Sequence, residues 1–247
     1  MRQTRAGTEG MRSRAEQWRV IAGLVLFSAA FGYVEAAVVA YLRSIYTPLR
    51  MHFYPGSSGE LFPLLSLEQL RILGPEHVGR LKTELGRELA TLLMLAGAAL
   101  TSARKLHEWV AAFLVCFGTW DITFYLFLRL LIHWPVSFLT WDILFLIPVP
   151  WTGPVLAPVL ASLSMIGSGL LLLWREYQNR PVYITGLRWG LILLGGAMTI
   201  AAFVWDFRNA ASGGDPNPFN WVIFMSGEAI GLLSFVSSLR HTRRVMD

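Results

Sequence analysis

Six apolar stretches, each about as long as a helix that crosses a lipid bilayer, divide this chain and constrain its fold. Charged residues make up 15% of the sequence, against roughly 25% in soluble domains, so lipid is the expected surroundings. The predicted fold class is all-α: a polytopic integral membrane bundle of six transmembrane helices and one short half-helix. The spans are expected at about 20–42, 85–103, 108–131, 153–174, 186–205 and 219–239.

The predicted half-helix covers 137–147, between Pro135 and Pro148. A helix of that length rises only about 16 Å, roughly half of the hydrocarbon thickness. We therefore expect a re-entrant or interfacial segment rather than a seventh span, which would also move the basic C-terminus to the outer side.

Lysine and arginine set the expected orientation, because cytoplasmic ends of spans are enriched in them. Both ends of the chain are predicted to be cytoplasmic, with basic segments at 1–19 and 241–247 flanking one transmembrane domain at 20–240. We expect the first apolar stretch to be retained, since no small-residue cleavage site follows it. The expected location is the bacterial inner membrane, and the lipid bilayer is the main partner.

A long outer loop is predicted at 43–84, and part of it has helix signals. Ser66 and Gln69 have the spacing of a capping box, and Gly74-Pro75 would end the short helix 67–73. We expect this helix to lie on the outer membrane surface.

Acidic residues inside the spans are the strongest functional signal. A carboxylate at the bilayer centre costs about 2.5–3.5 kcal/mol, so such residues usually face a protein interior or a water-filled cavity. With the predicted topology they all fall toward the outer side, where they could line one pocket. The candidate pocket residues are Glu35, Glu88, Asp121, Asp142 and Glu228. Asp206, at the outer end of the fifth span, is better explained as an interfacial residue.

Four other side chains are predicted to support this pocket. Tyr125 and Arg129 follow Asp121 at four-residue spacing, so the three share one helix face. His133 continues that stripe, and Arg87 is the other basic residue at this depth.

A net-negative outer pocket favours a cation or a proton as its ligand. Our first hypothesis is a non-enzymatic membrane protein that binds or passes such an ion, as a subunit of a larger complex or as a homo-oligomer. The second is a structural accessory subunit whose buried acids lock helices together. The Gly227-x-x-x-Gly231 spacing around Glu228 favours close helix packing there.

The third hypothesis is a membrane-embedded metal-dependent enzyme. Hard divalent cations take oxygen ligands, so Glu35, Glu88, Asp121 and Asp142 would be the metal ligands if a divalent ion is the cofactor. No known catalytic motif supports this hypothesis, and the histidines lack metal-binding spacing. The net charge of +5 is not a nucleic-acid signal, because the basic residues cluster at the ends of apolar segments.

Overall fold

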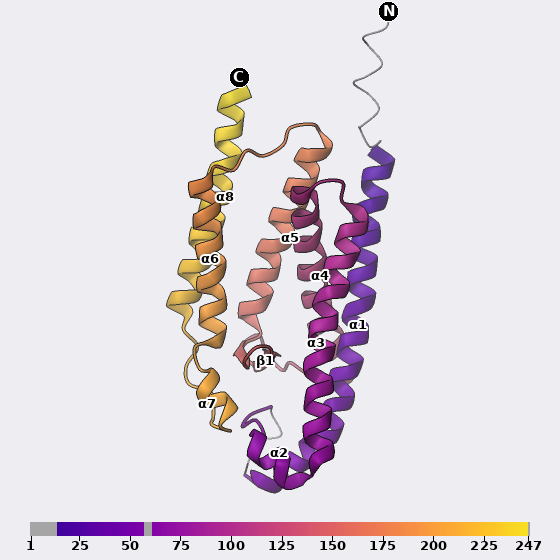
Figure 1. Ribbon diagram of the computed structural model, residues 1–247, viewed down its shortest axis with the longest axis vertical. Helices are drawn as coiled ribbons and strands as arrows, with labels where there is room; N and C mark the ends of the chain where they lie inside the picture. The colour runs from indigo at the N-terminus through magenta and orange to yellow at the C-terminus, as the bar shows by residue number, and fades with distance from the viewer. Residues whose placement is uncertain (1–13, 57–60, 247) are drawn as a thin grey trace, which may run out of the picture.

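The computed structural model describes residues 14–56 and 61–246, so most of the predicted basic segment 1–19 lies outside the described residues. The chain is mainly helical, with one short β-hairpin between two long helices (Figure 1). The elements are α1 (Arg14–Phe53), α2 (Leu67–Leu73), α3 (Pro75–Ser102), α4 (Leu106–Ile132), β1 (Trp141–Phe145), β2 (Trp151–Pro154), α5 (Leu156–Tyr177), α6 (Gly186–Val204), α7 (Phe207–Ala211) and α8 (Trp221–Met246).

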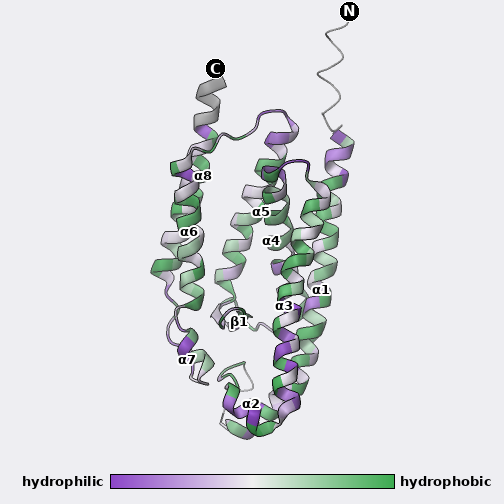
Figure 2. Cartoon of the chain, in the orientation of Figure 1, coloured by the Kyte–Doolittle hydropathy of each residue, from purple (hydrophilic) through white to green (hydrophobic). Residues whose placement is uncertain are grey.

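Five helical segments are long and apolar enough to cross a membrane: α1, α4, α5, α6 with α7, and α8. The predicted second span, 85–103, forms the later part of α3 and is not one of the five. Arg87 and Glu88 lower the apolar character of α3, and hydrophilic residues collect along its earlier half and on α2 (Figure 2). The predicted number of six spans therefore includes one amphipathic helix.

The prediction of a half-helix at 137–147 is wrong, because this segment contains strand β1 of an antiparallel hairpin. Trp141 pairs with Pro154 and Phe145 with Trp151, and the ladder is irregular between Ile143 and Phe145. A short apolar run flanked by prolines fits a strand as well as a helix by periodicity, and its aromatic and β-branched residues favour the strand. The prolines after Ile147 stand in the hairpin connection, where no ladder N–H is needed.

Helix α1 has 40 residues and continues to Phe53, well past the span end predicted near residue 42. The predicted outer loop 43–84 therefore contains the end of α1, the whole of α2 and the start of α3. The prediction of α2 and its capping box is confirmed: the Ser66 side chain accepts from the Gln69 N–H, and the Gln69 side chain accepts from the Ser66 N–H. α3 begins at Pro75, directly after Gly74.

Helix α4 is the centre of the bundle, since it packs against α1, α3 and α5. Helices α6 and α8 pack mainly against each other, and they form a pair at one side of the molecule (Figure 1). The hairpin links the two parts, because β2 contacts both α5 and α6. It lies toward the end of the bundle that carries α2 and α7, which we call the α2 end.

Candidate functional site

A cavity of about 570 Å³ lies near the α2 end. Its walls come from α1, α3, α4, the hairpin, α2 with the segment that leads into it, and the end of α7. Apolar residues form most of the lining, and a minority of charged and polar side chains is set among them. The ionisable residues that line it are Glu35, Arg43, Tyr46, Arg80, Glu84, Arg87, Glu88, Asp121, Tyr125 and Asp142.

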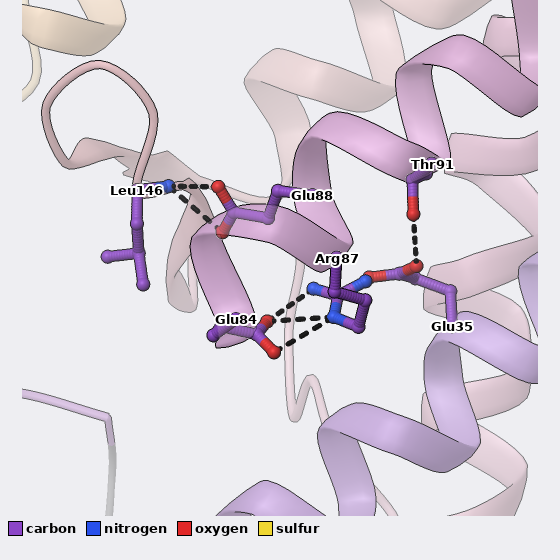
Figure 3. A network of polar contacts seen from close by, with 6 residues as sticks. All are labelled: Glu35, Glu84, Arg87, Glu88, Thr91 and Leu146. Atoms are coloured by element: carbon purple, nitrogen blue, oxygen red, sulfur yellow. Dashed lines mark hydrogen bonds and ion pairs between the residues drawn. The ribbon is translucent and has the colours of Figure 1, made fainter. Parts of the chain in front are cut away.

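An ion-pair network joins α1 to α3 at one wall (Figure 3). Arg87 binds Glu35 of α1 through Nη1, and its Nε donates to both Glu84 oxygens at 3.0 and 2.9 Å. Thr91 donates to the other Glu35 oxygen at 3.3 Å. Glu35 is only 7% exposed, so Arg87 compensates the charge of a buried carboxylate.

Glu88 binds the backbone of the hairpin connection, whereas Glu35 binds a basic side chain. Both of its carboxylate oxygens accept from the backbone N–H of Leu146, at 3.0 and 2.8 Å (Figure 3). Leu146 directly follows β1, so this contact holds the hairpin connection against α3. A charged acceptor on a backbone N–H is among the stronger hydrogen bonds in proteins.

Asp142 of β1 lies at the centre of a second network. Tyr125 donates to its Oδ2 at 2.9 Å, and Arg43 Nη2 lies 3.7 Å from its Oδ1. The Arg43 guanidinium carbon is 3.5 Å from the centroid of the Trp134 ring, which fixes its plane. Burial raises the pKa of Asp142 to about 6, against the opposing effects of Arg43 and the Tyr125 hydrogen bond.

Asp121 differs from the other carboxylates of the cavity. Its Oδ2 accepts a hydrogen bond from Ser162 Oγ of α5 at 2.8 Å, and it is 7% exposed. Within the described parts of the chain, no lysine, arginine or histidine forms an ion pair with it. It is therefore a buried acid without a paired cation.

Two side chains that line the cavity have donor atoms without a hydrogen-bond acceptor. Arg43 Nε and Nη2 and the indole Nε1 of Trp120 are buried, and no described residue accepts a hydrogen bond from them, although Nη2 lies within ion-pair distance of Asp142. Trp120 is 4% exposed and lines the cavity. An unsatisfied buried donor costs about 1–3 kcal/mol, so each is a group that a ligand could satisfy.

The structure thus brings together Glu35, Glu88, Asp121 and Asp142, with Arg87 and Tyr125 beside them, but it leaves three predicted residues elsewhere. Glu228 of α8 accepts from Thr199 of α6 at 3.3 Å, outside the cavity. Arg129 is exposed and donates to the carbonyl of His133 at 2.6 Å and to that of Pro135 at 3.2 Å, so it closes the end of α4. His133 follows the last residue of α4 and does not line the cavity either.

Asp206 accepts hydrogen bonds from the side chains of Asn209 and Asn217 in the connection between α6 and α8, and it does not line the cavity.

Sequence reasoning missed Arg43, Glu84 and Ser162. Glu84 precedes Glu88 by four residues, which places both on one helix face and could have been noticed. Arg43 lies in the predicted outer loop 43–84, since the first span is expected to end at about residue 42, whereas α1 continues to Phe53. Nothing in the sequence indicates that Ser162 of α5 faces Asp121 of α4.

The four predicted metal ligands do not form a close cluster. Among the described residues, no three of Glu35, Glu88, Asp121 and Asp142 have ligand atoms within 4.8 Å of one another. The group that meets this distance is His107, Glu108 and Glu176, at the opposite end of the bundle. There Lys105 Nζ lies 2.8 Å from Glu176 Oε1, so this carboxylate already has a cationic partner in an ion pair. The hydrogen bond to Glu176 raises the pKa of Lys105.

Comparisons with protein-family models, with curated proteins and with solved structures found no match for this chain.

Proposed function

We propose that this protein is a multi-pass membrane protein that binds a cation or a proton in the cavity near its α2 end. Support for the membrane comes from five long apolar helices and from large side chains that stay exposed along them, among them Leu26, Leu193 and Leu233. Exposed apolar surface of this extent is typical of lipid contact.

The proposed orientation has the α2 end at the outer side of the bacterial inner membrane and both chain ends in the cytoplasm. The excess of arginine near the chain ends and at the α3–α4 and α5–α6 connections supports it. The cavity would then open toward the outer side, where it meets ions from outside the cell.

The unpaired Asp121 is the observation that carries the ion-binding proposal. A buried carboxylate must either hold a proton or have a cation near it, because an isolated charge is strongly disfavoured in a dry interior. The carboxylates that line the cavity also outnumber its guanidinium groups by two. The cavity is therefore suited to a positive ligand, with Asp121 as its direct contact.

Asp121→Asn is expected to abolish ion binding, because the amide keeps the shape and loses the charge. Purified protein in detergent would be mixed with sodium, potassium, magnesium or ethylammonium chloride, and proton release would be followed with a pH indicator. Wild-type protein should exchange about one proton for one of these cations, and Asp121→Asn should release none.

Glu228→Gln is the matched control for this experiment. It removes another acid from an apolar helix, but Glu228 contacts Thr199 and does not line the cavity. Equal proton release from wild type and from Asp121→Asn would refute Asp121 as the binding group.

A structural role is the second candidate, and the Glu35–Arg87–Glu84 network favours it. These residues join α1 to α3 and satisfy one another without a ligand. The two proposals assign different acids: Arg87 and its partners hold the bundle, while Asp121 binds the ion. The separated positions of the four acids give little support to a metal-dependent enzyme.

A further inference from the structure

The cavity has two kinds of wall, and the difference indicates what class of molecule it accepts. Leucines from the segment before α2, from α2 and from early α3 form an apolar wall: Leu61, Leu64, Leu65, Leu67, Leu70 and Leu81. Ionisable side chains line the cavity from α1, α4 and β1 and also from α3, where Arg80, Glu84, Arg87 and Glu88 stand beside the leucine wall. A bare inorganic ion would use the polar wall and leave the leucine wall without a partner.

The polar wall offers hydrogen-bond donors as well as the acid Asp121. Arg43 is held by Asp142 and by the Trp134 ring, yet its Nε and Nη2 remain without acceptors among the described residues. The indole N–H of Trp120, the residue next to Asp121, is equally unsatisfied. A guanidinium whose plane is fixed and whose Nε and Nη2 donate no hydrogen bond to a described residue fits the planar edge of a carboxylate or a phosphate.

The donor site and the acid site are neighbours. Tyr125 stands one helical turn after Asp121, and its hydroxyl binds Asp142, which in turn pairs with Arg43. A ligand with an ammonium group and an oxyanion a few bonds apart could therefore reach both. The cavity volume of about 570 Å³ lies within the usual range of small-molecule sites, roughly 300–1,000 Å³.

We propose that the cavity binds a zwitterionic amphipath, with its ammonium group on Asp121, its oxyanion on Arg43 and Trp120, and its alkyl chain along the leucine wall. This inference rests on the proposed cation site, and it identifies that cation as the ammonium group of a lipid-like molecule. Each buried CH₂ group of the chain would strengthen binding about fourfold.

Four probes separate the parts of this proposal. Dodecylphosphoethanolamine carries both charged groups and the chain, dodecylamine carries only the ammonium group, dodecyl phosphate carries only the phosphate group, and phosphoethanolamine has no chain. Native mass spectrometry of the full-length protein, released from an uncharged maltoside detergent, would count bound copies and give relative Kd values. We expect one copy of dodecylphosphoethanolamine, bound at least about tenfold more tightly than any other probe, since a charge-assisted hydrogen bond accounts for that factor.

Substitutions then assign each charge. Arg43→Gln should weaken dodecylphosphoethanolamine about tenfold, because the oxyanion contact is lost, and should not weaken dodecylamine, because the substitution adds no positive charge and frees the Asp142 carboxylate. Trp120→Phe keeps an aromatic ring, removes the N–H, and should weaken the same probe about threefold. It tests the donor site independently if Arg43→Gln fails to fold. Arg129→Gln is the control, because Arg129 is exposed at the end of α4 and should leave all four affinities unchanged.

A different experimental result would refute each part of the proposal. If dodecylamine binds as tightly as dodecylphosphoethanolamine and depends on Asp121, the oxyanion site is refuted while the cation site stands. If phosphoethanolamine binds as tightly as its dodecyl ester, the ligand is a soluble zwitterion and the assignment of the leucine wall is refuted. If no probe binds and cations release no proton from the wild type, both this inference and the proposed cation site fall.

Discussion

Arg87→Ala is expected to lower the free energy of unfolding by about 3 kcal/mol, the largest stability effect among the substitutions considered. The change removes the shared partner of Glu35 and Glu84 and leaves Glu35 buried, with Thr91 as its remaining donor among the contacts described above. Removing one member of a buried ion pair is strongly destabilising, because the other charge stays without compensation. Thermal unfolding of the detergent-solubilised protein would show the effect as a lower Tm.

The control for this prediction is Lys82→Ala, which removes an exposed basic residue from the same helix. Adding Glu35→Gln to Arg87→Ala should recover part of the loss, because the neutral amide no longer needs a counter-charge. If Arg87→Ala unfolds at the same temperature as Lys82→Ala, the network does not hold α1 against α3.

Gly195→Ala is expected to destabilise the α6–α8 pair by about 1–3 kcal/mol, the usual effect of overpacking a tight contact. A Cβ atom at this position would lie 2.6 Å from the carbonyl oxygen of Gly227 and 2.8 Å from the backbone nitrogen of Gly231. Both atoms are backbone, so the helices would have to move apart. Denaturation followed by tryptophan fluorescence would measure the change.

The adjacent residue gives a closely matched control. Gly196 has no atom within 4 Å of its hypothetical Cβ, so Gly196→Ala should be neutral or stabilising by up to about 1 kcal/mol. Equal stability of the two alanine variants would mean that α6 and α8 are not in close backbone contact. The same contact holds Glu228 beside Thr199, so a separation of the helices should also expose that carboxylate.

The sequence predicted the helical elements well where local chemistry determines them. The α2 helix and its capping box depend on Ser66, Gln69 and Gly74 alone, and the structure contains them as expected. The hairpin depends instead on two strands that meet only after folding. Nothing in 137–147 shows that a strand partner stands at 151–154, so periodicity could not distinguish it from a short helix.

The gathering of four acids around one cavity was predicted from their depth in the spans. Depth alone could not predict which helices would be neighbours, and for that reason Glu228 was included although α8 packs mainly against α6. The arginines that pair with the acids were harder to assign. Arg43 reaches the cavity because α1 continues beyond the expected bilayer boundary, and that extension has no signal in the hydropathy pattern.

The β-hairpin connects parts of the chain that otherwise have little contact. On one side its connection holds Glu88, and its first strand carries Asp142 into the cavity. On the other side Trp151 stacks on Phe203 of α6, and Gly153 lies against Phe203 and Phe219. We expect a displacement of α6 and α8 to move the hairpin, which carries Asp142 and binds Glu88. By thermodynamic linkage, a ligand in the cavity and a partner bound to the α6–α8 pair change each other's affinity by the same factor if both of them favour one position of the hairpin.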